Sequence, residues 1–176
     1  MPEINVDLHG SAPDKHKFAL LLIDVINDFD FPEADQLLKY AQPMARNLLR
    51  LKRRAQKAGV PVVYVNDNFG RWKSDFRRTV EHCARHGRGR EVVESLWPEE
   101  NDYFVLKPKH SGFFSTTLET LLRYLETQTL ILTGIAGNFV SFSQQTMPIC
   151  AISTCLCPRI ARYRIQRRKT TLHLRP

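Results

Sequence analysis

The chain has 176 residues, enough for one α/β domain with a buried core and too few for two. Its 43% hydrophobic and 25% charged residues are typical of a globular protein, and no stretch approaches the roughly 18 consecutive apolar residues of a membrane span. The net charge of +8 is concentrated in residues 140–176, which hold seven of the 26 basic residues and none of the 18 acidic ones. The body before them is nearly neutral, so we expect no specific nucleic-acid partner and no membrane association.

The first 17 residues are interpreted as an N-terminal extension. They contain acidic side chains and lack the apolar core of a signal peptide, so a cytoplasmic protein is expected.

Four short apolar runs alternate with helical patterns along the body of the chain. This alternation predicts a single α/β domain with a parallel sheet and helices on both faces, a Rossmann-like architecture. The predicted strands are residues 18–25, 60–65, 103–106 and 129–135.

Two helices are predicted between these strands, with a less regular helical stretch between them. Apolar residues at spacings of three and four predict a helix over about 34–58, in which Pro43 is a candidate break. Lys52 and its basic neighbours lie in the last turns of this helix, where positive charge interacts favourably with the negative end of the helix dipole. A second helix is expected over about 117–127, with Thr116 and Glu119 at capping-box spacing. The segment 70–97 is expected to be helical in parts, interrupted by its glycines.

The pattern changes after Asn138. Residues 140–176 have no sustained helical or strand period, no acidic residue and three of the four cysteines, Cys150, Cys155 and Cys157. Three cysteines without a fourth ligand are weak evidence for zinc. We interpret 140–176 as an aberrant basic tail and 18–139 as the incomplete domain.

Two charged residues and one turn fall at the carboxyl ends of the predicted strands, where open parallel sheets bind ligands. Asp24 closes the first strand in IDVINDF, Lys107 closes the third in KPKHSGF, and the turn TGIAGNF follows the fourth. Taken singly, a strand-end aspartate is commonly a helix cap and a lone lysine is commonly solvated. Their occurrence together favours a catalytic site. His110 is expected to orient its loop.

These three segments resemble the isochorismatase-like superfamily, which includes nicotinamidases, carbamoylases and other cysteine hydrolases. The family pattern is an aspartate in ID-x-x-NDF, a lysine shortly before SGF, and a G-[IV]-A-x-N-x-C turn. The first two segments are complete here, whereas the third reads GIAGNF followed by Val140 where the family has cysteine. The resemblance covers residues 18–139.

The resemblance implies a strand order of 3-2-1-4-5-6, of which only the first four strands are expected to be encoded. The fourth strand would then be an unpaired apolar edge, and poor solubility would follow. The resemblance also implies a small-molecule substrate and a homo-oligomer for an intact family member. The nicotinamidase branch holds a metal through Asp-x-His, but Asp67 has no histidine near it, so no metal and no cofactor are expected.

In the mechanism that the resemblance implies, the aspartate at Asp24 takes a thiol proton and Lys107 stabilises the negative charge. The turn Ile135, Ala136, Gly137 and Asn138 forms the oxyanion and substrate loop. Val140 has no nucleophilic atom, so the chain as written is expected to be inactive as a cysteine hydrolase of amide or carbamoyl compounds. True isochorismatases also lack the cysteine and hydrolyse a vinyl ether with the aspartate as acid, which leaves a second possibility. A non-catalytic protein with a polyanion-binding tail is the third.

A deletion of one base explains the missing cysteine. A T placed before any valine codon creates a cysteine codon, and synonymous codons for the residues from Val140 onward then allow the reading CVLFTANDAYMRD, the family's nucleophile and following helix. Residues 18–139 thus predict a hydrolase. Residues 140–176 are interpreted as out-of-frame sequence in which the nucleophile has been lost.

Overall fold

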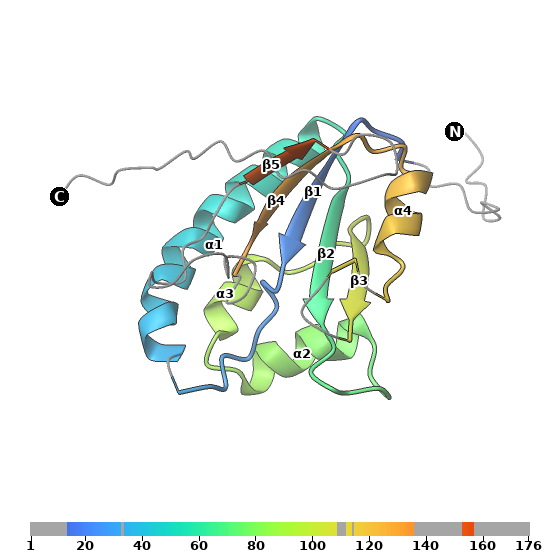
Figure 1. The fold of residues 1–176 in the computed structure, drawn as a ribbon. Helices are drawn as coiled ribbons and strands as arrows, with labels where there is room; N and C mark the ends of the chain where they lie inside the picture. The colour runs from blue at the N-terminus through green and yellow to red at the C-terminus, as the bar shows by residue number, and fades with distance from the viewer. Residues whose placement is uncertain (1–13, 33, 109–111, 114, 136–152, 157–176) are drawn as a thin grey trace, which may run out of the picture.

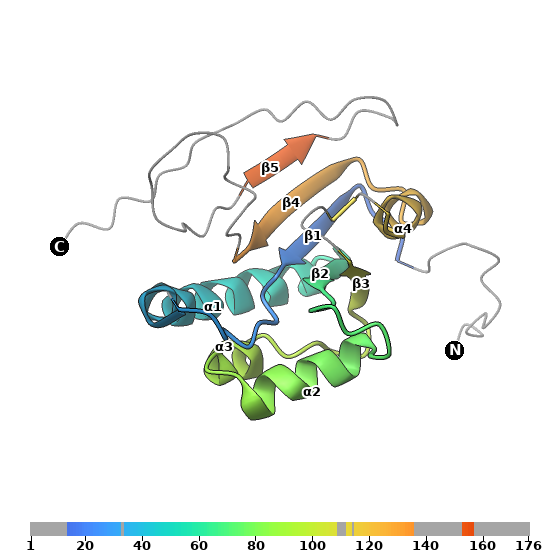
Figure 2. The same ribbon diagram turned by 60° about the horizontal axis from the view of Figure 1, so that its bottom comes forward.

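Four parallel strands form the centre of the fold, with helices on both faces (Figures 1 and 2). The computed structural model describes residues 14–32, 34–108, 112–113, 115–135 and 153–156. Its sheet has the order β3-β2-β1-β4-β5. The strands are β1 (Phe18–Ile23), β2 (Val62–Asp67), β3 (Tyr103–Lys107), β4 (Thr129–Gly134) and β5 (Ser153–Leu156). The predicted α/β class and the order 3-2-1-4 are confirmed.

The sheet separates two apolar cores. The helices α1 (Ala34–Lys57), α2 (Phe76–His86) and α3 (Arg90–Ser95) lie on one face, and α4 (Leu118–Tyr124) lies on the other (Figure 2). Leu20 and Leu22 of β1 pack into the first core, whereas Leu21 and Ile23 pack into the second. Because β1 is covered on both faces, its sequence is an unbroken apolar run. Among the described residues, none of the helices is both long and apolar enough to cross a membrane.

The helix α1 continues through Pro43, so the candidate break at this residue does not occur. Proline in a helix interior costs a hydrogen bond and about 3 kcal/mol. Ala41, Met44, Ala45 and Leu48 are buried on either side of it in one core, and their burial favours a single continuous helix.

Lys52 is not a solvated charge at the end of α1. Its side chain is 1% exposed, and its ammonium lies 2.6 Å from Asp102 and donates to the carbonyl of Trp97 at 3.0 Å. The helical pattern placed Lys52 among exposed basic neighbours, but the carboxylate that holds it comes from the segment just before β3. Only the packing of that segment against α1 could reveal this pair.

The helix α4 begins at Leu118, close to the predicted start, but without a capping box. The hydroxyl of Thr116 accepts from the Leu118 N–H at 3.3 Å and donates to the Gly112 carbonyl. Glu119 instead pairs with Arg123 one turn later at 2.6 Å. The glycine-interrupted helices predicted within 70–97 are confirmed as α2 and α3.

The expectation that β4 would be an unpaired edge is wrong. β5 pairs with it in antiparallel register, from Thr129 opposite Leu156 to Leu132 opposite Ser153. The backbone N–H and C=O groups along β4 favour any strand that can reach them. The segment that we interpreted as an aberrant tail therefore supplies a strand to the sheet.

Candidate active site at the carboxyl ends of the strands

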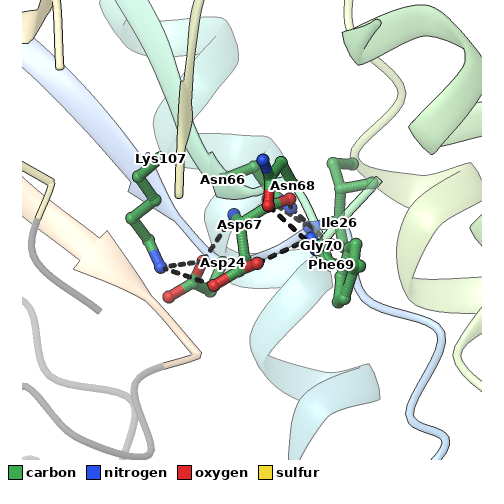
Figure 3. A network of polar contacts seen from close by, with 8 residues as sticks. All are labelled: Asp24, Ile26, Asn66, Asp67, Asn68, Phe69, Gly70 and Lys107. Atoms are coloured by element: carbon green, nitrogen blue, oxygen red, sulfur yellow. Dashed lines mark hydrogen bonds and ion pairs between the residues drawn. The ribbon is translucent and has the colours of Figure 1, made fainter. Parts of the chain in front are cut away.

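Asp24 directly follows β1 and is held by two hydrogen bonds to the backbone of the neighbouring strand β2. Its φ of +53° lies in the left-handed region, which is uncommon for residues other than glycine. Its N–H donates to the carbonyl of Val65 on β2 at 3.0 Å. Its Oδ1 accepts from the N–H of Asp67 at 3.1 Å. These bonds turn the chain sharply and fix the carboxylate at the end of the sheet (Figure 3).

Lys107, the last residue of β3, reaches across the end of β2 to Asp24. Its Nζ lies 3.0 Å from Asp24 Oδ1, although β2 separates β1 from β3 in the sheet. The Lys107 side chain is 2% exposed, whereas that of Asp24 is 23% exposed. The structure thus brings together two of the predicted catalytic residues, with the ammonium beneath and the carboxylate nearer to solvent.

Asp67 is a member of this cluster that the sequence analysis did not place in the site. Its Oδ2 lies 3.6 Å from the ammonium of Lys107, and its Oδ1 accepts from the N–H of Phe69 at 2.6 Å (Figure 3). Asp67 ends β2, and the strand-end rule that identified Asp24 and Lys107 would have identified it as well. From the sequence, Asp67 is considered only as a metal ligand. Among the described residues, no group of three His, Cys, Asp or Glu side chains lies close enough to hold a metal ion.

Asn66 fixes the loop that follows Asp24. The residue is fully buried; its Oδ1 accepts from the N–H of Ile26 at 3.1 Å and its Nδ2 donates to the carbonyl of Ile26 at 2.7 Å. A buried amide that satisfies both backbone groups of one residue holds that residue firmly. Sequence reasoning missed Asn66 because an asparagine inside an apolar strand has no local signal for its partner.

The end of β4 lies directly beside the end of β1. Gly134 pairs with Ile23, and the N–H of Ile135 donates to the Ile23 carbonyl at 3.0 Å. Since Asp24 follows Ile23, the chain leaves β4 next to the carboxylate. Ile135 is thereby placed at the site. Ala136, Gly137, Asn138 and Val140, and also His110, lie outside the described residues.

Burial raises the pKa of Asp24 above its usual 3.8, and the nearby charge of Asp67 acts in the same direction. The Lys107 ammonium opposes this shift without cancelling it. A carboxyl group with a raised pKa is better suited to accept and return a proton near neutral pH than an ordinary aspartate.

This shift predicts a pH dependence of stability. Folding favours the protonated form of Asp24, so its contribution to the free energy of unfolding should be largest at low pH and decline as pH rises from about 3.8 through the folded-state pKa. Urea unfolding of the wild type and of Asp24→Asn between pH 3.5 and 7 measures this contribution, because asparagine cannot titrate. A difference between the two curves that is independent of pH would contradict the prediction.

Cys83 does not belong to this site. It is buried in the core on α2, and burial raises the pKa of its thiol to about 12. A thiol that stays protonated at neutral pH is not a nucleophile. Within the part of the chain that the structure describes, Asp24, Asp67 and Lys107 are the groups at the strand ends suited to proton transfer and charge stabilisation.

Comparison with known proteins finds a family match over most of the chain. The model of the isochorismatase domain matches residues 18–144. The uncharacterized isochorismatase family protein YaaI of Bacillus subtilis is 38% identical over 120 residues, which cover 68% of this chain and 66% of YaaI. The ureidoacrylate amidohydrolase RutB of Acinetobacter baylyi is 26% identical over 118 residues, covering 55% of this chain and 48% of RutB. The chain therefore spans about half to two thirds of the length of these relatives.

Solved structures show the same fold. An isochorismatase-like hydrolase from Alkaliphilus metalliredigens superposes with a TM-score of 0.51 at 25% identity, covering 70% of this chain and 67% of that one.

Proposed function

The chain belongs to the isochorismatase family, a family of hydrolases. On this premise we propose that it has a hydrolase site for small amide or carbamoyl compounds. In this site Asp24 is the proton acceptor and Lys107 is the cation. The observation that carries the proposal is the 3.0 Å contact between the buried ammonium and the partly exposed carboxylate. The amide class is supported by the relative named as a ureidoacrylate amidohydrolase.

The proposed chemistry needs a thiol at position 140. Asp24 takes the thiol proton, the thiolate attacks the carbonyl carbon, and Lys107 stabilises the negative charge near it. The amine then leaves with a proton returned by Asp24, and water hydrolyses the thioester to the acid and the free thiol. Valine at position 140 has no atom that can attack. We therefore propose that the chain as written binds substrate without turning it over by this route.

We further propose that one base is missing before codon 140. An added T would restore the cysteine and would allow a family-like continuation after it. Sequencing of the gene across codons 138–142 tests this directly, and the expected result is one additional T.

The functional prediction is tested on a panel of small amide and carbamoyl compounds. The chains compared are the restored-frame chain, its Asp24→Asn and Lys107→Met variants, the chain as written and its Val140→Cys variant. The chain with the restored frame should release ammonia or amine at a rate that Asp24→Asn or Lys107→Met lowers by about a hundredfold or more, because each removes a group used in the transition state. The chain as written should be inactive. Val140→Cys alone should restore little activity, since the residues that follow the nucleophile also differ. Substantial turnover by Val140→Cys alone, or by the unmodified chain, would contradict the proposal.

A second candidate function is vinyl ether hydrolysis without a cysteine. The raised pKa of Asp24 favours it, since this reaction needs the carboxyl group as an acid. In that case the unmodified chain would cleave isochorismate, and Asp24→Asn would abolish the cleavage. An unmodified chain without activity toward isochorismate excludes this alternative.

A further inference from the structure

Asp67 contacts both members of the Asp24–Lys107 pair. Its carboxylate lies 3.6 Å from the Lys107 ammonium, and its backbone N–H donates to Asp24 Oδ1 at 3.1 Å. Figure 3 shows the Lys107 ammonium in contact with both carboxylates. Neither contact is needed for Asp24 and Lys107 to meet, so the proposed mechanism leaves Asp67 without a role.

The charges of this cluster do not balance. Two carboxylates, with side chains 23% and 31% exposed, share one ammonium that is 2% exposed. With all three groups ionised the cluster carries one net negative charge. A lysine paired with a single carboxylate at hydrogen-bond distance would hold that carboxylate ionised and make it a poor base. A second carboxylate at a comparable distance repels the charge of the first and so weakens the net stabilisation of its ionised form.

The hydrogen bonds leave one oxygen of Asp24 open. Both Lys107 and the Asp67 N–H contact Oδ1. Within the described residues, Oδ2 makes no hydrogen bond and is the atom left to carry a proton.

We propose that Asp67 is a positioning residue that divides the charge of Lys107 between two carboxylates and thereby keeps Asp24 able to take up and return a proton. This proposal rests on the proposed role of Asp24 and adds a residue to it. It differs from a purely structural role for Asp67, in which the 2.6 Å bond from the Phe69 N–H would only stabilise the turn after β2. A structural role predicts a change in stability without a change in the protonation of Asp24.

The test follows the side-chain carboxyl carbons of Asp24 and Asp67 by carbon-13 NMR as pH is raised, in the unmodified chain. Coupled carboxylates titrate in shared steps, so the Asp24 curve should be broadened, with a Hill coefficient clearly below one. In Asp67→Asn, Asp24 should titrate in a single step at a pH lower by about one unit, a tenfold weaker affinity for the proton. Asp67→Glu, which keeps the charge, should return the midpoint toward that of the wild type.

Asp30→Asn is the matched control. Asp30 lies in the loop that follows β1, its carboxylate is exposed, and that carboxylate makes no contact with Lys107. It should move the Asp24 midpoint far less than Asp67→Asn does. An unchanged or raised Asp24 midpoint in Asp67→Asn would overturn the proposal. If Asp67→Asn does not fold, the titration curve of Asp24 in the wild type is the test by itself. A simple single-step curve would then overturn the proposal.

The titration requires neither a nucleophile nor turnover, so it separates this proposal from the proposed function. Coupled titration together with an inactive restored chain would refute the hydrolase proposal alone. Uncoupled titration together with an active restored chain would refute only the role of Asp67.

Discussion

Replacing Gly134 with alanine should severely destabilise the folded state. The residue has a φ of +150°, which side-chain-bearing residues rarely adopt, and an added Cβ would overlap the backbone carbonyl oxygen of Ile23. Backbone atoms of the central strand cannot move aside without breaking the β1–β4 pairing. We expect a loss of more than about 4 kcal/mol in the free energy of unfolding, in the range reserved for severe steric conflicts. Urea unfolding followed by circular dichroism measures it.

Gly59→Ala provides the control for this prediction. Gly59 also has a positive φ, +70°, but an added Cβ there meets no atom within 4 Å. Its substitution should cost about 1 kcal/mol, from backbone conformation alone. Equal losses for the two variants would show that the contact with Ile23 does not constrain the end of β4.

Removing the ammonium of Lys107 should be the most damaging change of a charged residue in the site. Lys107→Met leaves two partly buried carboxylates facing each other without a cation. Removing one partner of a buried ion pair typically costs 3–5 kcal/mol, and the partial exposure of Asp24 and Asp67 places the expected loss near the lower end, at about 3 kcal/mol at pH 7. The loss should shrink at pH 4, where Asp24, whose pKa is raised by burial, takes up a proton.

Two further variants make the Lys107 prediction specific. Lys57→Met makes the same chemical change at an exposed position in the last turn of α1 and should alter stability by less than about 0.5 kcal/mol. The double variant Lys107→Met with Asp24→Asn should lose less than the sum of the single changes, because the orphaned charge is also removed. Additive losses, or a loss below about 1 kcal/mol for Lys107→Met, would contradict a buried ion pair in the site.

The two stability predictions concern the same feature of the fold. β1 lies between β2 and β4, and Asp24 directly follows its end. On one side, Lys107 reaches Asp24 from β3 across β2. On the other side, the chain leaves β4 next to Asp24. This arrangement brings the Asp24 carboxylate, the Lys107 ammonium and the end of β4 to one point. It also explains why Asp24 adopts a strained backbone angle, since the surrounding hydrogen bonds over-determine its position.

Local sequence patterns determined most of the fold. The apolar runs predicted β1 to β4, the spacing of apolar residues predicted α1 and α4, and the strand ends identified Asp24 and Lys107. These features depend on near neighbours in the chain, since a strand buried on both faces must be apolar throughout and a surface helix must be apolar along one side.

Other features were decided only by the tertiary structure. Pairing of Asp67 with Lys107, burial of Lys52 against Asp102, and the antiparallel β5 on the edge of β4 each join segments that are distant in sequence. A charged residue has the same local pattern whether its partner is water or a carboxylate from another strand. Strand order and helix packing supply that partner, and the sequence pattern around a single residue holds no information about it.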